Sequence, residues 1–130
     1  MLVIPPGAPT AFGRRIAIAW KDDGRAANAL IPGLRYFGDA EEIQVIMGYR
    51  DVEPTALPEP IAARGLTAKL HTLLIGSEPF GQLLLAKIDE VGADLLIMGA
   101  YAHSALHEML LGGVTRYVLA RATIPVLMRH

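Results

Sequence analysis

The sequence predicts an α/β domain built on an open, three-layer, parallel sheet. Two observations support this prediction. Short apolar segments alternate along the chain with segments whose apolar residues recur at helical spacing, which is typical of β-strands joined by helical crossovers. Hydrophobic residues also make up 52% of the 130 residues, and only 19% are charged, so the chain has enough apolar material to bury both faces of such a sheet.

The apolar runs predict five strands, at residues 15–20, 43–47, 66–75, 95–98 and 125–128. The third strand alternates apolar and polar residues, so we expect it near an edge of the sheet. Helical spacing and end signals predict the segments between these strands. They are a helix capped by Asp22 or Asp23, bent at Pro32 and ended by Gly38, a short helix at 60–64, a helix at 80–91 capped by Ser77 and stopped by Gly92, a turn at 106–110, and a helix at 114–122.

The first 13 residues read as an arm or linker, because they contain three prolines and two glycines. Residues 14–130 then form the domain. The apolar residues 2–4 and the prolines after them resemble the end of a final strand, much as residues 125–128 do. We therefore expect that the domain descends from, or was cut from, the second half of a tandem protein.

Composition excludes several classes of partner and location. The chain has no cysteine, which excludes disulfides and fits a reducing cytoplasm. No basic segment precedes the apolar start, so no secretory signal is expected. The formal net charge is −1 and no dense basic cluster occurs, which argues against nucleic acid and membrane surfaces as partners. The prediction is a soluble, cytoplasmic domain.

The segment from Gly99 to Thr115 has the features of a phosphate site. In parallel α/β sheets, ligands bind beyond the carboxyl ends of strands, here after Trp20, Met47 and Met98. Gly112 and Gly113 precede the last helix, where free amides and the positive end of the helix dipole converge. Thr115 adds a hydroxyl in the first helical turn. The alternative interpretation is a tight turn between two helices.

The same segment reads Gly99-x2-Ala102-x9-Gly112-Gly113, and apolar stretches flank it at 93–99 and 124–128. This pattern resembles the universal stress protein family over about residues 14–130. The family carries Gly-x2-Gly-x9-Gly-(Ser/Thr) after its fourth strand. The resemblance implies a five-stranded parallel sheet in the order 3-2-1-4-5, a Rossmann-like arrangement of the adenine nucleotide alpha hydrolase-like type.

The resemblance also implies a nucleotide site. The positions that match the family's ATP-binding residues are Gly99, Ala102, Gly112, Gly113, Val114 and Thr115. The family's acidic position after the first strand falls on Lys21. Trp20 and Met98 are the last residues of the strands expected at 15–20 and 95–98. The expected ligand is ATP or ADP with Mg²⁺.

Three residues depart from the family pattern. Ala102 replaces a glycine, Gly113 replaces Ser or Thr, and Lys21 replaces Asp. A lost hydroxyl bond, an alanine at a glycine position and a missing acceptor together cost roughly 2–3 kcal/mol, or about 30- to 150-fold in affinity. The sequence therefore predicts a stress-response domain that binds nucleotide weakly. The alternative is a structural or interaction module whose site no longer binds.

The other candidates are less specific. His103 and His107 share one helical face, but no third metal ligand is evident, so no metal site is predicted. No catalytic residue is assigned, although Asp22 or Asp23 leaves open a small nucleotide-using enzyme. The resemblance implies a homodimer paired through the last strand, with Ile124, Val126 and Met128 as a self-complementary face.

Overall fold

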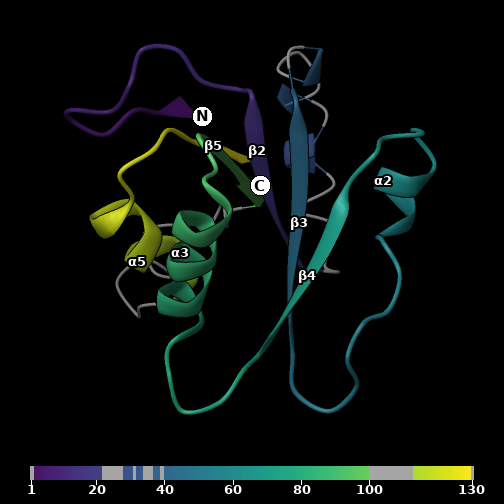
Figure 1. The fold of residues 1–130 in the computed structure, drawn as a ribbon. Coiled ribbons are helices and arrows are strands. Elements are labelled where there is room, and N and C mark those ends of the chain that lie inside the picture. The colour runs from purple at the N-terminus through teal and green to yellow at the C-terminus, as the bar shows by residue number, and fades with distance from the viewer. Residues whose placement is uncertain are drawn as a thin grey trace.

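The protein folds around one twisted β-sheet, shown in Figure 1. The computed structural model describes residues 2–21, 28–30, 32–33, 37–38, 40–99 and 113–129. Over these residues the sheet has six strands in the order β1-β6-β5-β2-β3-β4. The strands are β1 (Leu2–Val3), β2 (Arg15–Trp20), β3 (Glu42–Tyr49), β4 (Lys69–Leu74), β5 (Leu95–Gly99) and β6 (Val126–Arg129).

Three helices are complete within the described residues. They are α2 (Glu59–Ala62), α3 (Phe80–Val91) and α5 (Val114–Arg121). Between β2 and β3, residues 28–30, 32–33 and 37 are helical, as the sequence predicted for this connection. The expected cap at Asp22 or Asp23 and the expected helical turn at 106–110 lie outside the described residues.

The five parallel strands confirm the predicted order. From β4 to β6 the sheet reads β4-β3-β2-β5-β6, which is 3-2-1-4-5 when the five strands expected from the sequence are counted along the chain. β4 lies at an edge, as its alternating pattern predicted. The pairing of β1 was not expected. Residues 2–4 resemble the end of a strand but were assigned to the arm, and β1 pairs antiparallel with β6, placing Leu2 opposite Leu127 and Val3 opposite Val126.

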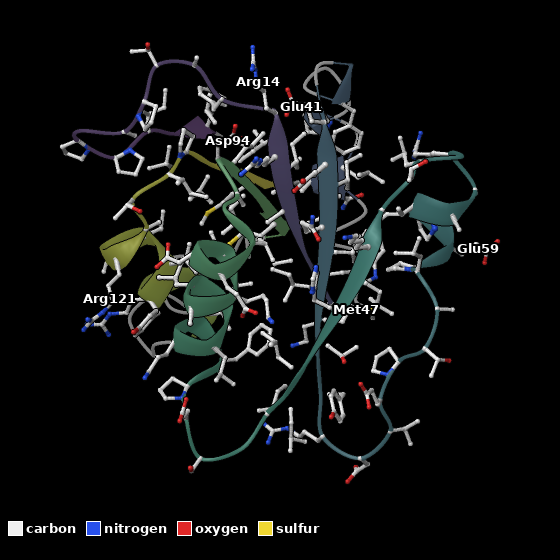
Figure 2. The ribbon with its side chains drawn as sticks, viewed as in Figure 1. Arg14, Glu41, Met47, Glu59, Asp94 and Arg121 are labelled. Carbon is white, nitrogen blue, oxygen red and sulfur yellow. The ribbon has the colours of Figure 1, made fainter. Side chains whose placement is uncertain are left out.

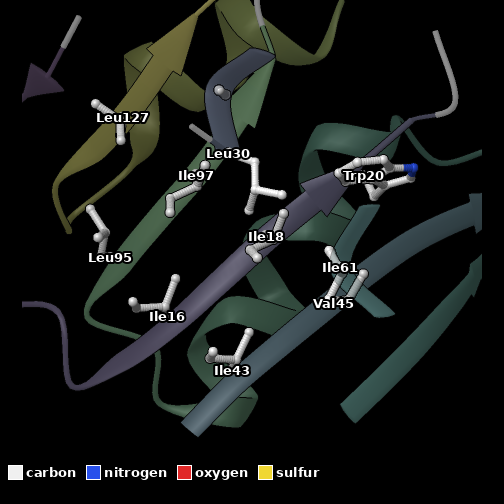
Figure 3. Close-up of a cluster of buried hydrophobic side chains, with 11 residues drawn as sticks. Ile16, Ile18, Trp20, Leu30, Ile43, Val45, Ile61, Leu95, Ile97 and Leu127 are labelled. Atoms are coloured by element: carbon white, nitrogen blue, oxygen red, sulfur yellow. The ribbon is translucent and has the colours of Figure 1, made fainter. Parts of the chain in front are cut away.

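Two apolar clusters make the three layers. On one face of the sheet, Ile16, Ile18 and Trp20 of β2 pack with Leu30 and with Ile61 of α2, as Figure 3 shows. On the other face, alternate strand residues pack under α3 and α5, with Ala17, Ile46, Leu84, Met98 and Val118 among the buried members. Because successive strand residues point to opposite faces, one sheet supplies both clusters.

The start of α3 corrects one prediction. The helix begins after Pro79, which has φ −59° and ψ 137°, and no side chain caps it. Ser77 is therefore not the cap. A residue that precedes proline is disfavoured in the helical region, so Glu78 cannot belong to the first turn. The predicted stop at Gly92 is confirmed, since this residue has φ 69° and closes the helix in the left-handed conformation.

α3 and α5 lie side by side because a glycine removes a side chain where they cross. A Cβ added at Gly81 would lie 2.9 Å from the Cβ, Cγ and Cδ1 atoms of Tyr117. On α5 itself, the Arg121 guanidinium carbon lies 4.8 Å from the centre of the Tyr117 ring. The position of α5, and of its first turn, thus depends on a close contact with α3.

Asp94 ties the arm to the amino end of the sheet. Its carboxylate accepts hydrogen bonds from the backbone N–H groups of Gly13 at 2.9 Å, Arg14 at 3.2 Å and Arg15 at 3.2 Å. Its own N–H donates to the carbonyl of Arg15 at 2.8 Å. Figure 2 shows Arg14, Glu41 and Asp94 together at this end, with Met47 toward the other. The arm therefore enters β2 at a fixed point.

Candidate functional site

The carboxyl ends of β2 and β5 define the place where a ligand is expected. β2 lies between β3 and β5 and runs parallel to both. The chain leaves β2 toward β3 and later returns to the other side of β2 with β5, so the strand order reverses between β2 and β5. Such a reversal opens a crevice at the carboxyl ends of the two strands. Ala19 lies opposite Met98, so Lys21 and Gly99 lie at the same edge.

The buried Trp20 is the last residue of β2, and the exposed Lys21 follows it. Trp20 is only 6% exposed and packs in the first cluster with Ile18 and Ile61 (Figure 3). It therefore belongs to the core on the face opposite α5 and does not offer its ring as an open wall of the crevice. Lys21 follows directly and is exposed. Of these two candidates, Lys21 alone presents a side chain to a ligand.

β5 ends in a similar way. Met98 is 5% exposed and packs in the second cluster, so it supports the site from below. Gly99, the last residue of β5, is half-buried and lies opposite Arg129 of β6. Its missing side chain leaves the backbone open to close approach, which the phosphate interpretation requires.

The first turn of α5 provides the third part of the site. Gly113 precedes the helix with φ 109° and ψ −176°, and no side chain within the described part of the chain caps its N–H groups. The first intrahelical bond recorded runs from the Tyr117 N–H to the Gly113 carbonyl at 3.2 Å. The earlier N–H groups of a helix have no partner within it and carry the positive end of its dipole. Val114 and Thr115 are half-buried in this turn.

The conformation of Gly113 explains one departure from the family pattern. With φ 109° and ψ −176°, the residue lies in a region of backbone space that is essentially restricted to glycine. A serine or threonine here would strain the chain. A Cβ added at Gly113 would meet no atom of the described residues within 4 Å. The glycine thus fits this backbone. Its presence in place of Ser or Thr therefore means more than the loss of one hydroxyl contact.

Two residues of the predicted site, Ala102 and Gly112, lie outside the described residues. The histidines considered as metal ligands, His103 and His107, also lie outside them. The strand registers place Lys21 and Gly99 at one edge of the sheet, and Gly113, Val114 and Thr115 start the helix that leads to β6. Trp20 and Met98 are buried in the core. Among the described residues, no group of three side chains is arranged to hold a metal ion.

A separate polar cluster lies on β3 and β4, away from this edge. Gln44 is 5% exposed, and its amide oxygen accepts a hydrogen bond from Nε2 of His71. The Gln44 amide nitrogen donates to Glu42 Oε2 at 3.4 Å. Burial lowers the pKa of His71 below 6.5, and the positive charge of Lys87 lowers it further. The ring is thus held toward its neutral form, which suits a side chain that hydrogen-bonds the buried amide of Gln44.

The sequence of the chain matches the family model described as the universal stress protein family over residues 41–130. The match covers more than half of the chain. The chain belongs to the universal stress protein family. No curated protein matches it in sequence at a significant level.

Solved structures agree on the fold. A universal stress protein from Archaeoglobus fulgidus DSM 4304 is 24% identical, with a TM-score of 0.72 over 91% of this chain, and this chain covers 44% of that one. A universal stress protein in complex with cAMP is 21% identical, with a TM-score of 0.68, and the match covers 93% of this chain and 98% of that one. A third, from Archaeoglobus fulgidus in complex with dAMP, is 22% identical, with a TM-score of 0.58 over 88% and 95% of the two chains.

These likenesses establish the open parallel sheet of the adenine nucleotide alpha hydrolase-like type. The chain spans less than half the length of the Archaeoglobus fulgidus protein with the TM-score of 0.72. In the part of the chain that the structure describes, no helix is long and apolar enough to cross a membrane.

Proposed function

We propose that this domain binds an adenine nucleotide weakly at the carboxyl ends of β2 and β5. The observation that supports the proposal most directly is the first turn of α5. It begins at Gly113, where no side chain of the described residues caps the turn and no atom of theirs lies within 4 Å of the place that a Cβ would take. An anion is stabilised at such a turn by N–H groups and by the helix dipole.

Each residue of the site has a role in this proposal. The backbone at Gly99 and Gly113 lets phosphate oxygens come close, because neither residue has a side chain. Thr115 offers a hydroxyl from the first turn. Lys21, where the family has an acidic residue, places a positive charge at the end of β2 and favours the phosphates over the nucleoside. ATP or ADP with Mg²⁺ is the expected ligand, and Mg²⁺ would bind mainly through the phosphates.

The site supports binding rather than catalysis. Lys21 is the one titratable side chain among the described residues 20–21, 98–99 and 113–115. The proposed function is thus that of a cytoplasmic stress-response domain whose state depends on nucleotide occupancy. Two copies would pair through the last strand, where the expected contact residues Val126 and Met128 are buried in the second cluster. A second copy would therefore meet mainly the backbone edge of β6.

The test compares two glycines with positive φ. Gly113 has φ 109° and Gly65 has φ 67°, and a Cβ at either would meet no atom of the described residues within 4 Å. Gly113→Ala should weaken ATP binding about tenfold. An alanine in this backbone conformation is strained by roughly 1–2 kcal/mol, and the backbone shift that relieves the strain would turn the first N–H groups of α5 away from the phosphates. Gly65→Ala should lower stability by a similar amount and leave ATP binding unchanged. Isothermal titration calorimetry measures both.

Two results would contradict the proposal. Equal ATP affinity in the Gly113→Ala and Gly65→Ala proteins would show that the first turn of α5 does not hold the ligand. The absence of any heat with millimolar ATP or ADP in the unmodified chain would favour the structural module without nucleotide binding. Phosphate release that Asp22→Asn or Asp23→Asn abolishes would instead indicate an enzyme.

A further inference from the structure

The sheet has an open edge along β4, the outermost strand on the side of α2 (Figure 1). Residues 69–74 pair with β3 in one unbroken register, and they include no proline. Natural proteins usually protect such an edge with proline, a bulge, a very short strand or charged side chains. Lys69, at the first position, is the one lysine of this strand. Within the described part of the chain, β4 therefore presents an edge with little protection.

The free backbone groups of β4 belong to alternate residues. The N–H of Ile75 donates to the carbonyl of Tyr49 on β3, at 2.8 Å. Because the backbone groups of successive residues point to opposite sides of a strand, those of residues 69, 71 and 73 also point toward β3. The N–H and C=O groups of Leu70, Thr72 and Leu74 point away from the sheet. These three residues can therefore form hydrogen bonds with a further strand.

The side chains of the same three residues lie on one face of the sheet. Leu70 packs at the margin of the first apolar cluster, and alternation places Thr72 and Leu74 on that face. The connection after β3 reaches this face, because Thr72 Oγ1 donates to Glu53 Oε1 at 2.6 Å. Leu74 is 59% exposed, and Val52, beside Glu53 in the chain, is 82% exposed. The edge thus combines free backbone groups, exposed apolar side chains and one carboxylate.

An added strand would meet a defined pattern here. Residues that lie opposite Leu70, Thr72 and Leu74 place their side chains on the same face as these three. The two outer positions meet leucine and favour apolar residues. The central position meets the Glu53 carboxylate, which can accept further hydrogen bonds beside the one from Thr72 and favours lysine or arginine. The pattern that fits is apolar–x–basic–x–apolar, and it reads the same in either strand direction.

We propose that the outer edge of β4 binds an extended segment of another protein as an additional strand, and that the segment has this pattern. Its affinity comes from backbone hydrogen bonds to residues 70, 72 and 74, and its specificity comes from Glu53 and the two leucines. The proposal does not depend on nucleotide binding, because none of these residues belongs to the carboxyl ends of β2 and β5.

A second copy of this chain fits the edge less well. Two β4 strands paired antiparallel around Thr72, in the middle of the strand, would bring two Glu53 carboxylates together, and like charges oppose such a contact. Self-pairing at this edge as well as at β6 would also join copies at both ends of the sheet and produce an open-ended fibre. A segment of different sequence with a basic centre avoids both problems.

The test uses the full chain and a blocked peptide of the sequence Ser-Thr-Val-Thr-Lys-Thr-Val-Thr-Ser, followed by NMR and calorimetry. We expect the peptide to slow hydrogen exchange at the N–H groups of Leu70, Thr72 and Leu74 at least tenfold. The N–H groups of residues 71 and 73 should be slow already, because they face β3. A peptide with Glu in place of the central Lys should bind about fivefold more weakly, since it replaces an attraction to Glu53 with a repulsion.

Glu53→Gln tests the charge, because it keeps an acceptor for Thr72. It should weaken binding of the Lys peptide about two- to fivefold and strengthen binding of the Glu peptide. Glu59→Gln is the matched control: it removes the same charge from α2, where the side chain is exposed and points away from the sheet in Figure 2, and should change neither.

Leu74→Pro tests the backbone contact. It removes an N–H that points outward and leaves the hydrogen bonds to β3 in place. It should bind the Lys peptide about fivefold more weakly than Leu74→Ala, which has the N–H and also lacks the leucine side chain. Equal binding by these two variants would contradict a strand added at this edge.

Other results would overturn the proposal in different ways. No binding of the Lys peptide at about 1 mM, or slowed exchange that spares residues 70, 72 and 74, would show that β4 is not the site. Equal binding of the Lys and Glu peptides would contradict the basic centre. Slowed exchange at these three residues in the chain alone, increasing with its concentration, would show that a second copy is the occupant.

Discussion

The two ends of the sheet are built in different ways. At the amino end, one carboxylate receives three backbone N–H groups, and the N–H groups of Glu41 and Glu42 both donate to the carbonyl of Arg14, at 2.6 and 3.0 Å. At the carboxyl end of β2 and β5, Lys21 is exposed and none of the side chains that the structure describes caps the start of α5. The first arrangement satisfies the backbone within the chain, and the second leaves groups for a ligand. The amino end should therefore determine stability, and the carboxyl end should determine binding.

The largest effect should come from Asp94→Ala. This change removes a charged acceptor from the N–H groups of residues 13–15, and hydrogen bonds to charged groups contribute roughly 1.5–3 kcal/mol. We expect the free energy of unfolding, measured by urea denaturation, to fall by about 2–3 kcal/mol. Asp94→Asn keeps one acceptor oxygen and should lose about half as much. ATP affinity should not change in either variant. A tenfold loss of affinity would show that the two ends are coupled.

Gly81→Ala should have a smaller effect that reaches both properties. The added methyl group would lie 2.9 Å from Tyr117, so α5 must move away from α3. Overpacking of this kind costs about 1–3 kcal/mol, and the better helix propensity of alanine offsets up to about 1 kcal/mol of it. We expect a stability loss of about 1–2 kcal/mol together with weaker ATP binding, because the first turn of α5 shifts.

Gly76→Ala is the matched control for that change, since a Cβ there meets no atom within 4 Å. It should leave both stability and affinity near their original values. If Gly81→Ala lowers stability without weakening ATP binding, the position of α5 does not set the affinity of the site.

The smallest effect should be the pH dependence that His71 contributes. Because burial and Lys87 hold its folded pKa below 6.5, the unfolded chain binds the proton more tightly than the folded chain does. Stability should therefore fall as the pH is lowered through 6.5 and below. His71→Asn should reduce this fall, as shown by urea denaturation at a series of pH values. If the variant keeps the full pH dependence of the original chain, His71 is not its source. ATP affinity should show no dependence on this substitution.

Sequence patterns predicted the sheet well because each strand is marked by residues that the core requires. The runs at 15–20, 43–47 and 95–98 are apolar on both faces, and the order of the five parallel strands follows from the family resemblance. The pairing of β1 escaped prediction, because so short an apolar run indicates a strand end without indicating its partner. Its pairing is determined by contacts with β6, which is about 125 positions further along the chain.

The candidate site stays a prediction, and the sequence indicates some of its parts. The segment from Gly99 to Thr115 indicates the end of β5 and the start of α5, since glycine spacing is visible in sequence. The alternation of Ile16, Ile18 and Trp20 would have placed the tryptophan on the core face opposite α5. The positive φ of Gly113 could not be anticipated, because a glycine in sequence permits that conformation without requiring it.

The central claim is that the carboxyl end of β2 and β5 binds a nucleotide through its phosphates. The most direct measurement is calorimetric titration of the full chain with ATP and, under the same conditions, with adenosine. The account predicts binding of ATP at micromolar to millimolar concentration and at least tenfold weaker binding of adenosine, because the N–H groups of α5 and the Lys21 charge act on the phosphates. Equal affinity for the two ligands, or no binding of ATP, would contradict it.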